Sequence, residues 1–174
     1  MPWNLDTSHS SVEFAVKHMV ISTTKGRFAD YEVDANVDET NVANSTATVR
    51  IAAGSIDSRD EKRDSHLRSA DFFDAENHPY ITFKSTRFES KGGDDYKLIG
   101  DLTIRGVTNE IALDSEITGP VTDPWGGVRY GISANAKIHR KDWGLTWNGV
   151  LEAGGLVVGD DVKLSIETEL VKAA

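Results

Sequence analysis

The sequence predicts an all-β protein in which about eight antiparallel strands curl into an up-and-down barrel, with one short surface helix. Three observations predict this class. Apolar and polar side chains alternate over long segments, so each strand has one dry face and one wet face, as is typical of antiparallel sheets. Helical periodicity is scarce, and the strands follow one another through short turns.

The alternation places the strands in order along the chain. The last strand has the cleanest pattern, because Val162, Leu164 and Ile166 are separated by single polar residues. Less regular candidates lie between residues 30 and 89. In chain order, the expected strands are 11–17, 30–38, 46–53, 80–89, 97–105, 110–117, 132–138 and 161–170.

One short helix is expected between the third and fourth of these strands. The residues at 58–61 (Ser-Arg-Asp-Glu) resemble a capping box, which predicts a helix that ends at Leu67 or Arg68. Asp64 and Arg68 have the spacing of an ion pair on one helix face. Leu67 is the one apolar residue of this segment, so we expect a connector on the surface rather than a core helix.

The connecting segments carry further signals. Phe72 and Phe73 follow the helix and are the expected anchors of this connection. Gly-Gly-Asp-Asp at 92–95 predicts a hairpin turn between two long strands. The segment 119–127, with two prolines and several glycines, predicts a long exposed loop.

Eight one-sided strands can form either a sandwich or a barrel, and the dry faces favour a barrel. They mix bulky residues with small ones such as Gly100, Ala134 and Ala136, which leaves volume for a guest. An eight-stranded barrel can hold one small ligand. Ten residues at ~3.3 Å rise and ~40° tilt give an interior of about 25 Å, close to the ~30 Å hydrocarbon depth of a bilayer.

Composition limits the classes of function. The chain has 174 residues, which is one domain by length, and carries a net charge of −9. An acidic surface repels nucleic-acid phosphates and anionic lipid headgroups, so neither is an expected partner. No apolar run approaches the ~20 residues of a membrane span. The first residues lack a signal-peptide pattern, so the chain as given is expected in the cytoplasm, or in the periplasm or outside the cell if a leader was removed.

No motif for catalysis or for metal binding is recognisable. The chain has no cysteine, and it contains no nucleophile elbow, P-loop or dinucleotide fingerprint. None of the histidines has the spacing of a metal site; they are His9, His18, His66, His78 and His139. We therefore expect no metal, no cofactor and no catalytic residue.

Several segments, in this order, resemble the YceI-like family of lipocalin-fold, polyisoprenoid-binding proteins. The similarity runs from Trp3 to about Val171. One departure is Thr24, where the family more often has an apolar residue. The segments that carry the resemblance are 3–10, 12–14, 17–19, 26–28, 65–74, 79–83, 100–108 and 140–145.

This resemblance implies a lipocalin-like barrel whose apolar interior holds a long isoprenoid chain, such as a prenylated quinone or its precursor. Each buried methylene contributes ~0.8 kcal/mol, so the tail alone can supply the affinity and polar groups need only orient a head group. Inward positions of the strands predict the contacts to the tail: Phe14, Val16, Ile51, Phe83, Leu102, Ile104, Ile111, Leu113, Leu164 and Ile166. Each of these residues could equally be plain core.

The rim of the barrel is expected to contribute Met19, Phe28, Trp143 and Trp147. For Trp143 the alternative is a packing role, because Asp-Trp-Gly at 142–144 resembles a turn that plugs one end of the barrel. His18 and Arg27 are the candidate contacts to a polar head group.

Three functions remain open. The first is non-catalytic binding, storage or transport of an isoprenoid lipid. The second is an enzyme that acts on such a lipid with His18, Arg27 or Asp142 at the barrel mouth. The third is a stress-related interaction module with a filled core. A homodimer, formed through an exposed strand or through residues 119–127, is compatible with each of them.

Overall fold

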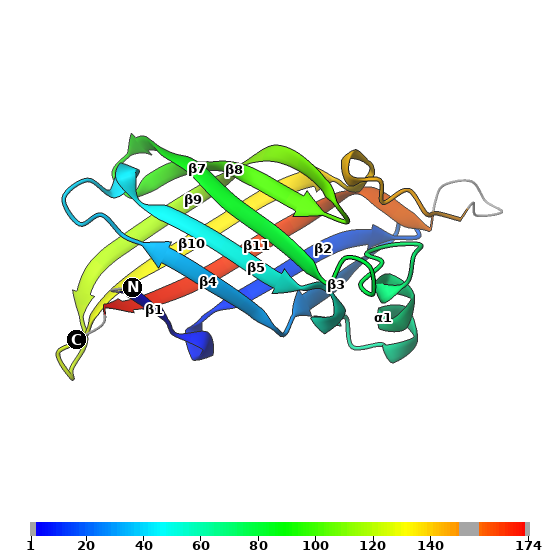
Figure 1. The fold of residues 1–174 in the computed structure, drawn as a ribbon, viewed down its shortest axis with the longest axis horizontal. Coiled ribbons are helices and arrows are strands. Elements are labelled where there is room, and N and C mark those ends of the chain that lie inside the picture. The colour runs from blue at the N-terminus through cyan, green and yellow to red at the C-terminus, as the bar shows by residue number, and fades with distance from the viewer. Residues whose placement is uncertain (1–2, 150–156, 173–174) are drawn as a thin grey trace.

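The computed structural model describes residues 3–149 and 157–172, in which a single antiparallel sheet curls around an apolar core (Figure 1). The strands are β1 (Trp3–Leu5), β2 (Ser11–His18), β3 (Ser22–Phe28), β4 (Tyr31–Asn36), β5 (Thr46–Ala52), β6 (Ile56–Asp57), β7 (Tyr80–Gly92), β8 (Asp95–Ile104), β9 (Val107–Thr122), β10 (Val128–His139) and β11 (Val158–Lys172). The helix α1 (Glu61–Arg68) lies at one end of the sheet, and β1 and the end of β11 lie toward the other end.

Strand order confirms the predicted up-and-down connectivity. The order is β4-β5-β7-β8-β9-β10-β11-β2-β3-β6, with β1 paired to β11. The strands β4 and β6 form the two edges of this order. Short links connect each edge strand to a strand near the opposite edge: residues 29–30 connect β3 to β4, and residues 53–55 connect β5 to β6. Backbone bonds bridge both links: Ala29 N donates to Ser55 O at 3.1 Å, and Ala52 N donates to Asp30 O at 2.9 Å. The two ends of the sheet therefore meet, and the sheet takes a barrel-like, lipocalin-like form.

The predicted count of eight strands is wrong, because the described residues form eleven. The three strands outside the prediction are β1, β3 and β6. The segment of β3 has Phe28 as its one large apolar residue, and β6 is only two residues long. The links at residues 29–30 and 53–55 each shift the alternation by one residue, since the inward positions change from even to odd numbers between β3 and β4 and from odd to even between β5 and β6. The short β1 pairs with β11 and was outside every predicted strand.

The short helix is confirmed, but its capping is not the predicted one. Asp60, not Ser58, is the N-cap, and its side chain accepts from the backbone N of Arg63. Ser58 is buried, and its hydroxyl and backbone N both donate to Asp64. Since Asp64 is used in this way, Arg68 pairs instead with Glu61, at 2.6 Å.

The connections follow the sequence in one case and differ in another. The predicted hairpin turn is confirmed, because β7 ends at Gly92 and β8 begins at Asp95. The expected long loop at 119–127 is shorter, because β9 continues to Thr122 and leaves only residues 123–127 outside the strands. A register shift in the pairing of β9 with β10 accommodates the Gly-Pro step there.

The core is formed by the inward residues of the strands, as the alternation predicts. Leu113 and Leu170 have the largest fully buried side chains. A 3-10 turn (Arg140–Trp143) follows β10 and places Trp143 at the end of the core. The indole Nε1 of Trp143 donates to Leu102 O at 2.9 Å. None of the described residues forms a helix long and apolar enough to cross a membrane.

Candidate binding cavity

An apolar cavity of about 120 Å³ lies inside the barrel, toward the end that carries α1. Its walls come from inward side chains of β2, β5, β7, β8, β9 and β11, and Leu67 of α1 contributes to its lining. The surface of the cavity is apolar. This follows from the strand pattern, because every second residue of each contributing strand points to the lumen.

All ten residues predicted to contact a tail line this cavity, and so does Phe28, which was predicted for the rim. They share an inward position on a strand, and they come from β2, β3, β5, β7, β8, β9 and β11. The predicted residues found in the lining are Phe14, Val16, Phe28, Ile51, Phe83, Leu102, Ile104, Ile111, Leu113, Leu164 and Ile166.

The remaining predicted residues lie elsewhere. Met19 is in the exposed turn between β2 and β3. Trp143 is buried beneath the wall in the packing role that the sequence left open. Trp147 packs on the cap described below, outside the lining.

Neither candidate contact to a head group lines the cavity. His18 ends β2, on the face that carries Phe14 and Val16, but beyond the lining. Arg27 is exposed on the outer face of β3 and pairs with Asp57 at 3.4 Å.

Sequence reasoning missed several lining residues. Val12, Ile81 and Val162 have the same inward spacing as residues that were named, so the pattern could have included them. Leu67, Phe72 and Phe73 come from the connection that was expected on the surface, with Phe72 and Phe73 as its anchors but not as cavity residues. The others are Glu13, Val49, Ile138, Arg140, Leu145 and Val158.

A cap of aromatic side chains covers the cavity at the α1 end. The rings of His66 and Trp147 lie 4.6 Å apart, and the ring of Phe72 lies 5.4 Å from that of Trp147. Asp71 holds His66 through a bond of 2.8 Å to Nε2. Phe73 packs edge-on against Phe28 of the barrel wall, at 5.9 Å. The cap therefore joins α1, the segment after it and the segment after β10.

Arg140 is a buried cation in the cavity lining, with a side chain that is only 4% exposed. Its guanidinium donates to backbone oxygens of two segments: to Gly159 at 2.9 Å, to Leu145 at 2.7 Å and to Trp147 at 2.9 Å. Burial lowers the pKa of Arg140, and the charge of Asp160 opposes that shift. These bonds make Arg140 a clamp between the start of β11 and the segment that carries Trp147.

A second, smaller apolar cavity of about 30 Å³ lies further along the barrel. It shares with the first cavity the side chains of Val49, Phe83, Leu113 and Ile166. These four residues therefore separate two free spaces in one apolar lumen.

Two glycines leave room for aromatic rings to lie flat against the barrel wall. Gly26 lies opposite Phe14 in the pairing of β2 with β3, and a Cβ at Gly26 would overlap the ring of Phe14. Gly100 has the same relation to Phe83, and a Cβ there would lie 2.5 Å from Cζ of that ring. Because each ring folds back over a glycine, it occupies less of the lumen than a ring that points to the axis.

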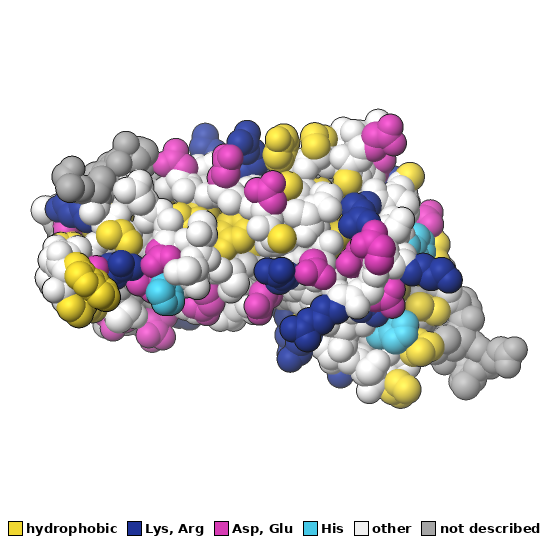
Figure 2. Space-filling view, turned by 90° about the horizontal axis from the view of Figure 1, so that it is seen from below, with side chains coloured by type: hydrophobic (Ala, Val, Ile, Leu, Met, Phe, Trp, Pro, Cys, Tyr) yellow, Lys and Arg dark blue, Asp and Glu magenta, His cyan; other side chains and the backbone are white. Residues whose placement is uncertain are grey.

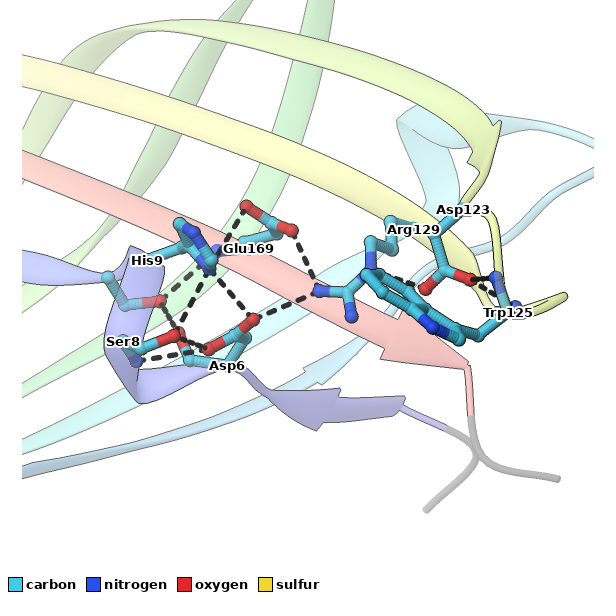
Figure 3. A network of polar contacts seen from close by, with 9 residues as sticks. Asp6, Ser8, His9, Asp123, Trp125, Arg129 and Glu169 are labelled. Carbon is cyan, nitrogen blue, oxygen red and sulfur yellow. Dashed lines mark hydrogen bonds and ion pairs between the residues drawn. The ribbon is translucent and has the colours of Figure 1, made fainter.

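A polar network lies away from the cavity, where β1, β10 and β11 meet (Figure 3). Arg129 binds three carboxylates, at 3.0 Å to Asp6, 2.8 Å to Glu169 and 2.8 Å to Asp123. Ligand atoms of Asp6, His9 and Glu169 lie within 4.8 Å of one another, a spacing that a metal ion could use. The guanidinium of Arg129 already binds Asp6 and Glu169 and supplies the positive charge that a metal ion would bring. The cluster is therefore best explained as an ion-pair network.

The network shifts the pKa values of its members. The Ser8 hydroxyl, His9 and Arg129 hydrogen-bond to Asp6 and hold the pKa of that carboxyl well below its usual range. The hydrogen bond to Asp6 raises the pKa of His9, and the charges of Asp6 and Glu169 add to this effect.

The fold and the cavity together define a class: an antiparallel barrel with an apolar lumen that is closed at one end by an aromatic cap. The YceI-like domain matches the chain over residues 3–170, so the chain belongs to the YceI-like family. The resemblance found in the sequence is thereby confirmed.

Relatives support this assignment. UPF0312 protein SA2479 of Staphylococcus aureus (strain N315) is 37% identical over 168 residues, which cover 96% of this chain and 95% of the relative. The crystal structure of the Campylobacter jejuni YCEI protein is 34% identical, with a TM-score of 0.79 and coverage of 91% of this chain and 90% of that one.

Two more distant structures share the fold. Burkholderia cenocepacia BcnA has a TM-score of 0.83 at 21% identity and covers 95% of this chain and 99% of its own. A polyisoprenoid binding domain from Saccharophagus degradans has a TM-score of 0.72 at 16% identity and covers 99% of both chains.

Proposed function

We propose that this protein binds a long apolar isoprenoid chain inside its barrel without changing it chemically, and so stores or carries the lipid. The observation that carries this proposal is the apolar lumen, in which two free spaces follow one another between walls of aliphatic and aromatic side chains. The shared fold with a domain that is described as polyisoprenoid binding supports the same class of ligand.

The free volume of the cavity shows how much of a prenyl chain fits before lining side chains must move. An apolar cavity of about 150 Å³ is enough for benzene, so the 120 Å³ here corresponds to about one five-carbon unit. Each further unit offers at most about 4 kcal/mol of burial, and part of that must offset the displacement of lining side chains. A longer chain would extend past Phe83 into the second space, as the rings of Phe14 and Phe83 shift.

The position of the polar residues favours binding over catalysis. An enzyme of this kind needs polar groups within reach of the reacting atoms. Among the described residues, His18, Arg27 and Asp142 all lie outside the cavity lining. Arg27 pairs with Asp57 on the outer face, and the backbone oxygen of Asp142 accepts from Asn109. The three residues named for the enzyme alternative therefore form no site in the cavity.

Titration of delipidated protein with prenols of increasing length tests the proposal. We expect affinity to rise with each added prenyl unit over the first few units, because the gain comes from the buried tail. Leu164→Asn puts an amide into the lumen, and we expect about tenfold weaker binding. Lys163→Asn, on the outer face of the same strand, is the matched control and should bind as the unaltered protein does.

Two results would refute the proposal. Absence of prenol uptake by the folded protein would favour the filled interaction module. Conversion of bound prenol to a product, lost on changing His18 or Asp142 but not Leu164, would favour the enzyme.

A further inference from the structure

The turn between β2 and β3 exposes three consecutive apolar side chains at the end of the barrel that carries α1. Met19 is 40% exposed, Val20 64% and Ile21 84%. His18 pairs with Ser22 across the base of this turn, and Met19 N donates to Val157 O at 2.8 Å. The turn is therefore an ordered projection with an apolar tip.

The backbone of this tip adopts a conformation that its residues disfavour. Met19 has φ of 50° and Val20 has φ of 69°. Positive φ is unusual for any residue with a Cβ and is a marked outlier for a β-branched one, whereas glycine or asparagine would fit without strain. Exposed apolar residues in a strained turn contribute little to folding, so their presence points to a role outside the folded core.

The charge around the tip is opposite in sign to that of the whole chain. Residues 14–29 contain Lys17, Lys25 and Arg27 and no acidic residue, although the chain carries a net charge of −9. Lys17 and Lys25 are exposed on the outer face of the hairpin. Neither lysine forms an ion pair with a residue in 3–149 or 157–172.

Several acidic groups on the elements around the hairpin are paired with cations of their own, whereas Glu13 lines a surface depression together with Lys25 and forms no ion pair with the described residues. Asp160 lies 3.3 Å from Lys141 Nζ, and Asp161 lies 3.3 Å from Lys137 Nζ. Asp57 pairs with Arg27 at the base of the hairpin. The tip thus combines an apolar end with two lysines that form no ion pair within the described part of the chain.

The hairpin lies next to the cavity. The inward face of β2 contributes Phe14 and Val16 to the lining, and Val158, which pairs with His18, also lines it. Figure 1 places the tip of β2 and the helix α1 at the same end of the molecule. In Figure 2, apolar side chains are visible at this end, close to basic ones.

We propose that the β2–β3 tip, defined as Met19, Val20 and Ile21 with Lys17 and Lys25 behind them, docks the barrel on the surface of an anionic lipid bilayer. Apolar side chains enter the boundary between headgroups and acyl chains, and lysines near an anionic surface add attraction. Docking would present the cavity end to the membrane. Its use in loading a lipid rests on the proposed function above, whereas docking itself does not. The acidic composition excludes such docking only for the molecule as a whole, not for this end.

Flotation with vesicles tests this proposal on the full chain. We expect binding to vesicles of phosphatidylcholine and phosphatidylglycerol in equal parts, weaker binding in high salt, and much weaker binding to phosphatidylcholine alone. Lys17→Gln with Lys25→Gln should lower binding to the anionic vesicles about tenfold. Val20→Asn with Ile21→Ser should lower it by about tenfold or more.

Two features of the experiment distinguish docking through the tip from loss of folding and from non-specific adsorption to vesicles. Asparagine tolerates the backbone conformation at Val20, so the tip variant should remain at least as stable as the parent. Val121→Ser with Trp125→Ser is the matched control, because these residues are 57% and 86% exposed at the other end of the barrel. This control should bind vesicles as the parent does.

The outcomes also separate this proposal from the proposed function. Uptake of farnesol from solution should be the same in the tip variant and the parent, while loading from vesicles should slow. No vesicle binding, or equal loss in the Val121/Trp125 control, overturns docking even when farnesol uptake is normal. Missing farnesol uptake with normal flotation overturns the proposed function and leaves docking standing.

Discussion

At the scale of single residues, Arg140 shows how a charge can be part of an apolar wall. Its side chain is buried, and its donors are directed to backbone oxygens of residues 145, 147, 158 and 159 rather than to the lumen. A buried carbonyl that loses its donor costs about 1–3 kcal/mol. Arg140 therefore stabilises the meeting of two chain segments at the cavity mouth.

Replacing this residue should have a large effect on stability. We expect Arg140→Ala to lower the free energy of unfolding by about 2–4 kcal/mol, because several buried carbonyls lose their donor at once. Urea denaturation followed by fluorescence measures this. Lys141→Ala, an exposed neighbour, should change stability by no more than about 0.5 kcal/mol. Equal effects of the two substitutions would show that Arg140 is not a clamp.

Gly26 provides a second prediction at this scale. Gly26→Ala should push the ring of Phe14 toward the axis of the barrel and weaken prenol binding, because the added Cβ overlaps that ring. Phe14→Leu in the same chain should restore binding, since the smaller side chain leaves room for the Cβ. Gly100 is a poorer test because a Cβ there would also lie 2.5 Å from the backbone oxygen of Lys84. If Phe14→Leu did not restore binding, the ring would not be the cause of the loss.

At the scale of elements, the Arg129 network ties β10, β11 and the 3-10 turn Thr7–His9 together far from the cavity. The carboxyl of Asp6 has a lowered pKa, so its stabilising effect is present above the unfolded value of about 3.9 and is lost as pH falls through the folded pKa. His9 has a raised pKa, so its effect is complete below about pH 6.5 and is lost as pH rises through the folded value.

Asp6→Asn tests this pairing. We expect the pKa of His9 to fall toward about 6.5, because its hydrogen-bonded carboxylate has become an amide. The loss of stability above the pKa of His9 should weaken at the same time. Titration of the His9 ring by NMR measures the shift, and Asp38→Asn, a carboxyl held by Thr40 and Asn41 instead, is the control. An unchanged His9 titration in Asp6→Asn would contradict the network.

Elements differ in how far the sequence predicts them. The strands could be located because alternation depends only on which face of the sheet a residue takes. The strands β3 and β6 could not, since β3 has few apolar residues and β6 is too short to show a pattern. The N-cap at Asp60 was missed because Ser58 and Asp64, which fit a capping box and a helical ion pair by spacing, bind each other in the folded chain.

At the scale of the whole molecule, the sequence likewise predicts one part of the cavity, its wall, and not the other, its cap. Wall residues such as Phe83 and Leu164 could be predicted from their inward positions. The cap could not, because Phe72 packs against the distant Trp147 and Phe73 against Phe28 of β3, and neither contact follows a local pattern. The clamp formed by Arg140 was missed for a similar reason, since its partners are backbone groups that carry no sequence signal.

The central claim is that one apolar chain occupies the lumen. Extraction of the purified, folded protein with organic solvent, followed by mass spectrometry, tests it most directly, with a delipidated sample reloaded with a prenyl quinone as the companion measurement. We predict an isoprenoid lipid in the extract or a single equivalent taken up on reloading, and less of both in Leu164→Asn. An extract free of lipid from a protein that also takes up no prenyl quinone would contradict the account.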